Sequence, residues 1–419
     1  MKVMMLGGGT NQLYAIKRIL NRGDQVLVSD YLESSPGKDL ATYTALADTF
    51  SYEDTLHEAK AHNIEAVLTV GTDQPVLTAA RVAETLDLPT PINSKTALYV
   101  TNKKHMKEVF KKHGIPSVDY IIIGQEHLLS QDLADRLKKF SYPGVLKPVD
   151  SQGQRGIFKV YSHKDVLQGL GETLKHSKTK EAVLEVYYEN QEVTVSGWVE
   201  NGETYILTMT DRVTFSEDNK IGVCVSHEHP SVHIENYGDT AKRLTEKIVN
   251  AFEIENGPIY FQFLVGKEGM LVNEIACRIG GAYEDQFIPK ITGFDILGEQ
   301  LNIAQGKPVK TDVLKAYDFR KNSACLSVQL YFAQPGSIER ITGKDCVLQM
   351  EGVADFRCHY KVGDCVPQTE NASARAGFCL IYGDNEKDIC HKISNFYKHF
   401  KIISKDGDNL LIKGCRGNR

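Results

Sequence analysis

The run Leu271–Gly281, with the sequence LVNEIACRIGG, places a carboxylate and a guanidinium four residues apart, just before two glycines. Its apolar residues predict a strand, in which side chains alternate between the two faces of the sheet. Glu274, Ala276 and Arg278 are therefore expected to point in the same direction. A carboxylate can bind a hard divalent cation through oxygen, and an arginine can hold phosphate or carboxylate with its planar fork.

A second apolar strand is predicted just upstream, at Pro258–Val265, and it contains Gln262. The intervening residues, Gly266–Gly269, form a turn of the kind that joins two antiparallel strands into a hairpin. Gln262 and Glu274 then face one cleft from neighbouring strands, which predicts a magnesium–nucleotide site. The alternative for this segment alone is an ordinary half-exposed hairpin with a Glu–Arg pair on its surface.

Chain length and charge narrow the classes of protein to consider. A chain of 419 residues predicts two to four domains with an ample core. Apolar content of 42% and charged content of 25% are typical of soluble globular proteins. The net charge of -5 argues against a polyanion-binding surface, so no nucleic-acid partner is expected. Every apolar run is shorter than the roughly 18 residues of a membrane span, so no membrane association is expected, and the N-terminal stretch is too short for a signal peptide.

The nine cysteines indicate reduced thiols rather than disulfides or a metal site. Their number is odd and no Cys-x-x-Cys pair occurs, while Cys358-His359 and Cys390-His391 lack the spacing of metal ligands. Reduced, buried cysteines are typical of a cytoplasmic protein, and this is the location we expect.

Residues 1–95 alternate between predicted strands and helices, which indicates a parallel sheet covered on both faces, as in a Rossmann-like domain. The turn Gly7–Gly9 opens a helix and Asp30 ends the next strand, as in a dinucleotide-binding fingerprint. The third glycine of that fingerprint would fall at Gln12, whose side chain hinders close helix–strand packing. A small-molecule or purely structural domain is therefore favoured over an NAD(P) site, and a dinucleotide oxidoreductase is kept as an alternative. The predicted strands are Lys2–Leu6, Gln25–Asp30 and Ala66–Val70, and helices are predicted at about 11–22 and through 79–84.

A second domain is expected at 96–185, where two lysines precede a glycine-containing loop. Lys103 lies in Thr101–Lys104, just before a helix that runs to His113, and Lys147 ends a strand just before the loop Asp150–Gly156. Small residues and two glycines let the backbone amides of this loop turn toward phosphate oxygens. Another strand follows at once, so the alternative is a plain hairpin with a flexible tip.

The run Ala182–Glu192 predicts an apolar strand that leads into an acidic hinge. The backbone groups from Val186 to Tyr188 are suited to an adenine edge, and Glu192 is suited to accept ribose hydroxyls. The alternative is a pair of charged residues on a solvated strand face.

The joint order of these motifs resembles the ATP-grasp superfamily. TNKKHMKEVFKKHGIP and YPGVLKPVDSQGQRGI are similar to its two lysine motifs. EIACRIGG followed by ITGFDILGEQLNIAQGKPV resembles carboxylate–amine ligases, particularly the L-amino-acid ligase and purine-biosynthetic branches. GGGTNQLYAIKRILNRGDQVLVSD resembles the domain that precedes the ATP-grasp fold, and AQPGSIERITG resembles the C-terminal lobe of amino-acid ligases. The resemblance covers nearly the whole chain.

This resemblance implies a multidomain protein of α/β and α+β class. A Rossmann-like domain at 1–95 would precede the ATP-grasp linker and small lobe at 96–185. The large lobe with the Mg-ATP site would span 186–310, and an α+β C-terminal lobe would span 311–419.

The resemblance also implies roles for single residues. Lys103 and Lys147 would neutralise phosphate charge, and Arg278 would stabilise an acyl phosphate and the tetrahedral intermediate, which makes Arg278 and Lys147 the catalytic residues. Gln262 and Glu274 would bind magnesium, with manganese as an alternative. The remaining ATP contacts are assigned to Ser151, Gly153, Gly156, Glu185, Val186, Tyr188 and Glu192.

Two positions depart from the family pattern. Gln262 stands where many members have a carboxylate, and Ala276 stands where many have a metal-binding asparagine. An amide can still coordinate through oxygen, whereas alanine cannot, although the purine-pathway ligases also carry alanine there. These departures leave the number of metal ions open and keep a catalytically weak ATP-binding relative or sensor as an alternative.

The implied reaction joins a small-molecule carboxylate to an amine through an acyl phosphate and releases ADP and phosphate. The product is an amide, as in a peptide, and the alternative is a purine-type ligase that uses bicarbonate or formate. A homodimer is one option for assembly. The candidate substrate contacts are His227, His229, Arg278, Gly280, Gly281 and Glu284, with ordinary surface histidines as the alternative for the first two.

Overall fold

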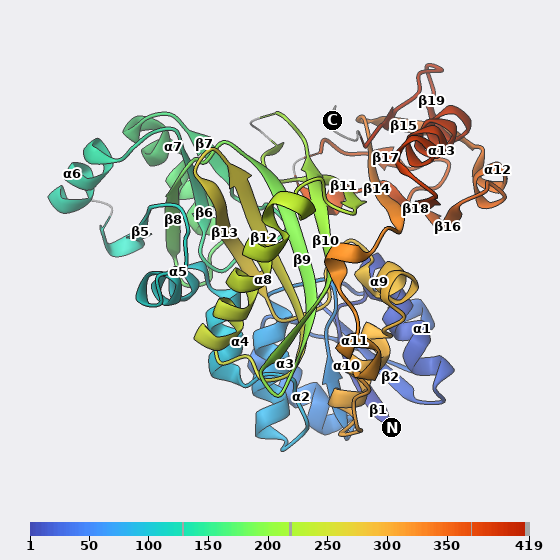
Figure 1. Cartoon of the computed structure of the whole chain (residues 1–419), viewed down its shortest axis with the longest axis horizontal. Helices are drawn as coiled ribbons and strands as arrows, with labels where there is room; N and C mark the ends of the chain where they lie inside the picture. Colours follow the sequence, from blue (N-terminus) through green and yellow to red (C-terminus); the bar gives the residue numbers. More distant parts are fainter. Residues whose placement is uncertain (128–129, 218–219, 370, 415–419) are drawn as a thin grey trace.

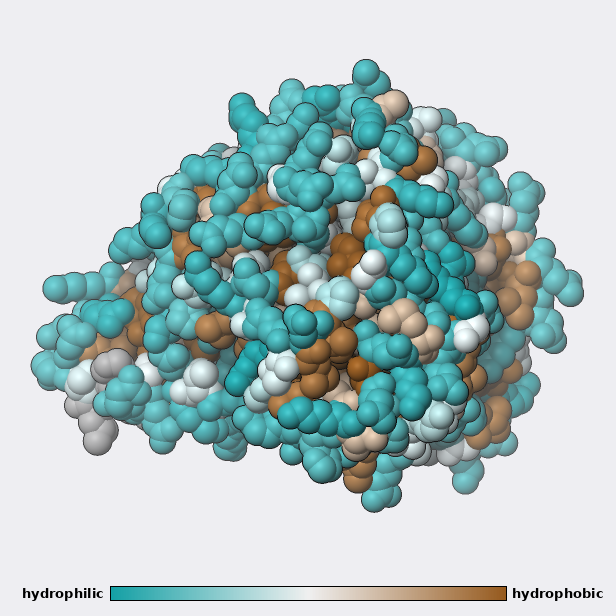
Figure 2. Space-filling view, turned by 90° about the horizontal axis from the view of Figure 1, so that it is seen from below, coloured by the Kyte–Doolittle hydropathy of each residue, from teal (hydrophilic) through white to brown (hydrophobic). Residues whose placement is uncertain are grey.

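The computed structural model describes residues 1–127, 130–217, 220–369 and 371–414 of the chain. Figure 1 shows the N-terminal elements at the bottom, a small lobe at the upper left and the C-terminal elements at the upper right, with long strands between them. Figure 2 shows the face seen from below, where hydrophilic side chains dominate and hydrophobic ones form smaller groups. Among the described residues, no helix combines the length and apolarity that crossing a membrane requires.

The N-terminal residues fold into the parallel α/β unit that their alternating pattern predicts. Its strands are β1 (Lys2–Leu6), β2 (Gln25–Asp30), β3 (Tyr43–Leu46) and β4 (Ala66–Leu68), and its helices are α1 (Leu13–Asn21), α2 (Tyr52–Ala61) and α3 (Pro75–Thr85). The strands pair in the order β3-β2-β1-β4, and all neighbours are parallel. Helix α2 begins where the Ser51 hydroxyl accepts the Asp54 N–H, and α3 begins at Pro75. The predicted bounds of β1 and β2 are confirmed.

The glycine turn after β1 is filled by the protein itself. Asp30 Oδ2 accepts the N–H of Gly8 at 2.7 Å, and Gln12 Nε2 donates to Val70 O at 2.7 Å. Gln12 is buried at the position where a dinucleotide fingerprint has its third glycine. The close helix–strand approach of a dinucleotide site is therefore absent at this turn.

The small lobe is an antiparallel sheet with helices packed beside it. Its strands are β5 (Tyr120–Gly124), β6 (Gly144–Pro148), β7 (Phe158–Val160) and β8 (Glu181–Val186), and the helices of this region are α4 (Ser94–Thr101), α5 (Lys103–Lys112), α6 (Gln131–Lys139) and α7 (His163–Lys175). The strand order is β5-β8-β6-β7. The strand–loop–strand unit predicted around Lys147 is confirmed, because β6 and β7 pair directly across the glycine-rich loop.

A long antiparallel sheet forms the centre of the molecule. Its strands are β9 (Asn190–Glu200), β10 (Glu203–Thr214), β11 (Cys224–His229), β12 (Gly257–Gly266), β13 (Gly269–Ala276), β14 (Cys325–Ala333), β16 (Val353–Cys358) and β18 (Gly377–Gly383). The order is β13-β12-β9-β10-β11-β14-β18-β16. The predicted hairpin is confirmed, since β12 and β13 pair from Gly266↔Gly269 to Tyr260↔Ala276.

The remaining elements cover this sheet or extend it. They are the helices α8 (Ile234–Ala251), α9 (Glu284–Thr292), α10 (Ile296–Ala304), α11 (Asp312–Lys315), α12 (Lys344–Leu348) and α13 (Glu386–His399), and the strands β15 (Gly336–Thr342), β17 (Cys365–Val366), β19 (Lys401–Ser404) and β20 (Leu411–Ile412). Trp198 is fully buried and meets Phe294 edge-on at 5.2 Å between ring centres, which packs the segment between α9 and α10 against β9.

The C-terminal residues share the central sheet with the preceding lobe. Strand β14 pairs with β11 in the register Ser226↔Gln329 to His229↔Leu326. The sheet therefore runs without interruption past the expected division at residue 311. The divisions at 95, 185 and 310 remain proposals about domain organisation.

Candidate active site

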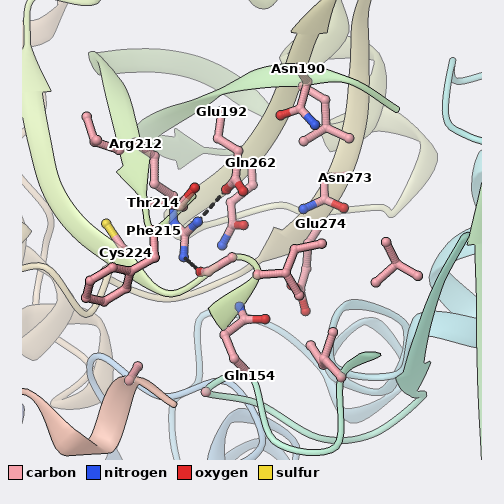
Figure 3. Close-up of a pocket in the computed structure, with 18 of the residues that line it drawn as sticks. Gln154, Asn190, Glu192, Arg212, Thr214, Phe215, Cys224, Gln262, Asn273 and Glu274 are labelled. Atoms are coloured by element: carbon pink, nitrogen blue, oxygen red, sulfur yellow. Dashed lines mark hydrogen bonds and ion pairs between the residues drawn. The ribbon is translucent and has the colours of Figure 1, made fainter. Parts of the chain in front are cut away.

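A cavity of about 890 Å³ lies where the small lobe, the central sheet, the N-terminal unit and the C-terminal elements meet. This volume is in the range of sites for small molecules and cofactors. The segment Gly71–Asp73 lines it from the N-terminal unit, and Ala372 and Arg375 line it from the C-terminal elements. In Figure 3, Gln154, Glu192 and Glu274 enter the same space from different parts of the chain.

Lys103 connects the glycine-rich loop to the hairpin. It is the first residue of α5, which begins where the Asn102 side chain accepts backbone N–H groups. Its Nζ lies 2.9 Å from Glu274 Oε1 and donates to Ser151 O at 3.0 Å. Burial disfavours the ammonium, but the Glu274 carboxylate outweighs burial and raises the pKa of Lys103. Lys103 is therefore a cation held at the base of the cavity.

The Glu185 carboxylate bridges two further lysines. Lys147 Nζ lies 2.6 Å from Glu185 Oε2, and Lys107 Nζ lies 2.9 Å from Oε1. Burial alone would raise the pKa of Glu185, but the two ammonium groups outweigh it and lower that pKa to about 2. Two lysines share this one carboxylate, and a group with more cationic than anionic side chains beside the cavity suits a polyphosphate. Glu185 holds the lysines, and its expected contact with adenosine stays a prediction.

The glycine-rich loop borders the cavity through part of its length. Ser151 and Gly153 line the cavity, whereas Gly156 lies outside the lining. Gly153 and Gly156 have φ of +71° and +67°, a left-handed conformation that glycine adopts readily. The loop also meets the C-terminal elements, because Ala372 N–H donates to Gly153 O at 3.4 Å.

The predicted adenine hinge lies at the edge of the cavity. Val186 and Tyr188 both line it. The Val186 N–H donates to Asp119 O at 2.9 Å, and the Tyr188 hydroxyl donates to Gly269 O at 2.9 Å. The hinge is anchored to its neighbours on both sides, and its contact with adenine stays a prediction.

Glu192 forms an ion pair with Arg212 inside the cavity, as Figure 3 shows. The two residues are cross-strand partners of β9 and β10, and Arg212 also donates to Gly222 O at 2.7 Å. Burial disfavours the guanidinium, but Glu192 outweighs burial and raises the pKa of Arg212. The ion pair with Arg212 uses Oε2 of Glu192. The other carboxylate oxygen, Oε1, would therefore make the predicted contact with ribose.

Three oxygen-bearing side chains of the hairpin β12–β13 reach the cavity. Gln262 pairs with Glu274, and the next pair is Phe263↔Val272, so Asn273 is the extra residue of a β-bulge. The bulge places Asn273 beside Glu274 in the lining of the cavity (Figure 3). A carboxylate with two carboxamides offers the hard oxygen donors that magnesium prefers.

Arg278 lies just beyond β13 and is held by the N-terminal unit. Its Nε and an Nη donate to Asp73 Oδ1 at 2.7 and 2.5 Å, and its guanidinium carbon lies 4.5 Å from the centre of the Tyr260 ring. Asp73 follows β4 at the carboxyl end of a parallel sheet, where α/β folds commonly bind ligands. A buried arginine, held by Asp73 and by an Nη1 hydrogen bond of 3.2 Å to Ile279 O, is thus presented to the cavity.

The two candidate histidines differ in position. His227 lines the cavity, and its Nδ1 shares a hydrogen bond of 3.1 Å with Thr210 Oγ1. Burial and then the charges of Arg212 and Arg375 hold the pKa of His227 well below its ordinary value, so it is neutral. His229 is buried outside the cavity lining, where burial lowers its pKa to about 4.

Of the three candidate substrate contacts that follow Arg278, one lies at the cavity. Gly281 lines the cavity, and a Cβ at this position would lie 2.9 Å from Gly71 O, so the close approach requires glycine. Gly280 and Glu284 lie outside the lining. Glu284 Oε2 accepts the Ala282 N–H at 2.8 Å, and burial raises the pKa of this carboxyl. Glu284 thus stabilises the turn through a hydrogen bond on the side away from the cavity.

Sequence reasoning missed several residues of this site. Lys107 stands one helical turn after Lys103, and this spacing was a usable signal. Asp73 follows a predicted strand of a parallel sheet, which was also a usable signal. Asn273 had no such signal, because a regular strand would point it away from Glu274. Arg375 reaches the cavity only through the tertiary fold.

Comparison with known families identifies two parts of the chain. Residues 140–285 match the ATP-grasp domain family, and residues 328–403 match the family of L-amino acid ligase C-terminal domain 2. These ranges contain the loop, the hinge, the hairpin and Arg278, as well as β14 and β18.

Several known proteins are similar along most of the chain. The L-arginine-specific L-amino acid ligase of Bacillus subtilis is 25% identical over 78% of this chain and 78% of its own length. The crystal structure of an L-amino acid ligase from Bacillus licheniformis matches with a TM-score of 0.80 at 17% identity, covering 96% of this chain and 98% of that one. An N5-carboxyaminoimidazole ribonucleotide synthetase from Thermotoga maritima matches with a TM-score of 0.69 at 18% identity, covering 96% and 99%.

Proposed function

We propose that this chain, which belongs to the ATP-grasp superfamily and carries the C-terminal domain 2 of L-amino acid ligases, is an ATP-dependent carboxylate–amine ligase. Its product is an amide, and ADP and phosphate are released. Similarity to an L-arginine-specific L-amino acid ligase supports amino acids as substrates. The observation that carries the proposal is the convergence of Lys103, Lys147, Glu274 and Arg278 on one cavity.

The lysines would bind the triphosphate. Lys103 and Lys147 reach the cavity from the two sides of the glycine-rich loop, and each is held by a carboxylate. Their charges favour the phosphate oxygens, and the loop backbone would exclude water from the γ-phosphate. Residues 186–188 would contact the adenine, and Glu192 the ribose.

The hairpin fits a divalent cation. Among the described residues, no three His, Cys, Asp or Glu side chains gather closely enough to hold a metal ion by themselves. Magnesium commonly binds through one or two carboxylates together with substrate phosphates. Glu274, Gln262 and Asn273 would hold magnesium, or manganese, only with the nucleotide present. When bound, the cation supplies charge neutralisation along the phosphates.

Arg278 would orient the carboxylate substrate. One carboxylate oxygen attacks the γ-phosphorus, the bond to the ADP oxygen breaks, and an acyl phosphate forms. The amine nitrogen then attacks the carbonyl carbon, and phosphate leaves with the bonding electrons. The guanidinium of Arg278 stabilises the negative charge on the reacting oxygens. Neutral His227 is suited to accept a hydrogen bond from the amine substrate. The amine attacks as the free base after its ammonium proton has passed to solvent, and the second N–H proton leaves with the phosphate.

The proposal is tested by phosphate release from Mg-ATP across a panel of single and paired L-amino acids, with bicarbonate and formate as separate additions. Release that depends on a pair, with the matching dipeptide seen by mass spectrometry, supports the ligase. Release that needs only bicarbonate or formate would instead support the purine-type alternative. ATP binding without release under any condition would support the catalytically weak relative.

Two expectations about the whole protein stay proposals with support of their own. The eight cysteines in the described part of the chain are all free, which fits a reducing compartment such as the cytoplasm. A homodimer is tested by light scattering on the purified protein, in which a single monomeric mass at working concentration would reject it.

A further inference from the structure

The glycine-rich loop and Arg278 are held by the same residue of the N-terminal unit. On one side, Gln152 Oε1 accepts the backbone N–H of Asp73 at 2.5 Å and that of Gln74 at 3.1 Å. On the other side, Asp73 Oδ1 accepts two N–H groups of Arg278 at 2.7 and 2.5 Å. The backbone of Asp73 thus meets the loop, while its side chain meets the arginine.

The segment between these contacts has little freedom of its own. Asp73 O accepts the Val76 N–H at 3.0 Å, and Pro75 restricts the backbone at the first position of α3. On the near side, the Gly71 N–H donates to Ile279 O at 3.1 Å. A segment fixed in this way passes a shift at its backbone to its side chain.

Arg278 depends on this segment for its orientation. It is 5% exposed, and Asp73 is the one carboxylate paired with it in the described part of the chain. The Tyr260 ring supports the flat face of the guanidinium, and Nη1 donates to Ile279 O at 3.2 Å. Asp73, which holds Nε and Nη2, is the charged partner that directs the guanidinium.

We propose that Gln152 and Asp73 are positioning residues that couple closure of the glycine-rich loop to the orientation of Arg278. This inference deepens the proposed function and rests on it. In the closed loop, Gln152 fixes the backbone of Asp73, and Asp73 directs the guanidinium toward the carboxylate substrate. In an open loop, both hydrogen bonds of Gln152 are lost. Closure of the loop over a bound nucleotide would thereby prepare the site for the acid.

A second contact between the small lobe and the N-terminal unit provides a matched control. Lys178 Nζ donates to Asp48 Oδ2 at 3.1 Å and lies 5.0 Å from the centre of the Phe50 ring. This contact lies away from Asp73 and Arg278 in the network of hydrogen bonds. Lys178→Ala therefore loosens the docking of the lobe and leaves the Gln152–Asp73–Arg278 connection intact.

Kinetics of the full-length enzyme test the coupling. Gln152→Ala and Asp73→Asn are each expected to raise the KM for the acid by about tenfold or more. The Kd for Mg-ADP should change by less than about twofold in Asp73→Asn and should rise several fold in Gln152→Ala, because loop closure and nucleotide binding are linked. In the double variant, the increase in KM should be clearly smaller than the product of the single effects, because both residues act through one connection. Lys178→Ala should change neither quantity. An unchanged KM in Gln152→Ala, or a double variant that equals the product, would overturn the coupling.

A readout without turnover comes from the loop itself. Arg155 is exposed in the same loop, so the rate of tryptic cleavage after Arg155 in the presence of Mg-ADP reports loop opening. Cleavage should be several times faster in Gln152→Ala than in the wild type or Lys178→Ala. Equal rates would overturn the role of Gln152 in holding the loop closed. Phosphate release by the wild type with an unchanged KM in Gln152→Ala rejects only this inference. If the wild type releases no phosphate but tryptic cleavage after Arg155 is faster in Gln152→Ala, the proposed function is rejected. The role of Gln152 in holding the loop closed is then supported.

Discussion

Lys103 Nζ lies 2.9 Å from Glu274 Oε1, so the carboxylate expected to bind a metal ion is already neutralised by a lysine. Burial would raise the pKa of Glu274, but Lys103 outweighs burial and lowers it. The other two oxygen donors, Gln262 and Asn273, carry no charge. A divalent cation therefore gains little from this hairpin alone and should bind together with the nucleotide.

Gln262→Glu should strengthen metal binding, because it adds a carboxylate beside Glu274. We expect the Kd for Mn-ADP to fall at least about fivefold, which is about 1 kcal/mol, as measured by electron paramagnetic resonance titration of Mn²⁺. Gln154→Glu adds the same charge on the glycine-rich loop and serves as the control. Equal tightening in both variants would show that charge, rather than coordination at the hairpin, is responsible.

Arg278→Ala should abolish ligation without weakening the nucleotide. Removal of a group that stabilises reacting oxygens lowers turnover by about 100-fold or more, while the Kd for Mg-ADP should stay within about twofold. Turnover is measured by phosphate release with the amino-acid pair that the panel identifies, and the Kd by calorimetry. Unchanged turnover would remove Arg278 from its role.

Glu185 should make the folded protein sensitive to strong acid. Its pKa is about 2 in the folded state against an ordinary 4.5, so the unfolded state binds more protons between these values. The stabilisation is full above pH 4.5 and is lost as the pH falls toward 2, amounting to about 3 kcal/mol. Urea titrations across this range measure it, and Glu185→Gln should lack this part of the dependence. At neutral pH that variant should be less stable by about 3–5 kcal/mol, because buried Lys107 and partly buried Lys147 lose their partner.

His229 should change the stability of the fold in a different pH range. Its pKa is about 4 in the folded state against an ordinary 6.5, so protons favour the unfolded state in between. The free energy of unfolding should therefore fall as the pH drops from 6.5 to 4, by about 3 kcal/mol from this residue. His229→Gln should flatten the slope, whereas His57→Gln at the exposed surface should leave it unchanged. Parallel slopes in all three proteins would contradict this assignment.

Local patterns were sufficient to predict much of the fold. Continuous apolar runs predicted β1 and β2 within their observed bounds, and the turn Gly266–Gly269 predicted the hairpin. The continuation of the sheet from β11 into β14 was not predictable in this way. These strands are far apart in sequence, and their pairing depends on the packing of everything between them.

Lys103, Lys147, Glu274 and Arg278 were singled out because one residue type fixes one chemistry, and all four line the cavity, while their roles stay predictions. Contacts that the tertiary fold decides were not predictable from local patterns. Glu185 was expected at the nucleotide, which stays a prediction, and its bridge between two lysines was not expected, because helix α5 brings Lys107 beneath it.

Oxygen transfer tests the acyl-phosphate account most directly. The acid identified by the panel is prepared with both carboxylate oxygens labelled with oxygen-18 and is incubated with Mg-ATP and the amine. The account predicts that each released phosphate carries one labelled oxygen, because the carboxylate oxygen that attacked phosphorus leaves with it. Unlabelled phosphate, formed alongside the amide, would contradict activation of the acid by phosphoryl transfer.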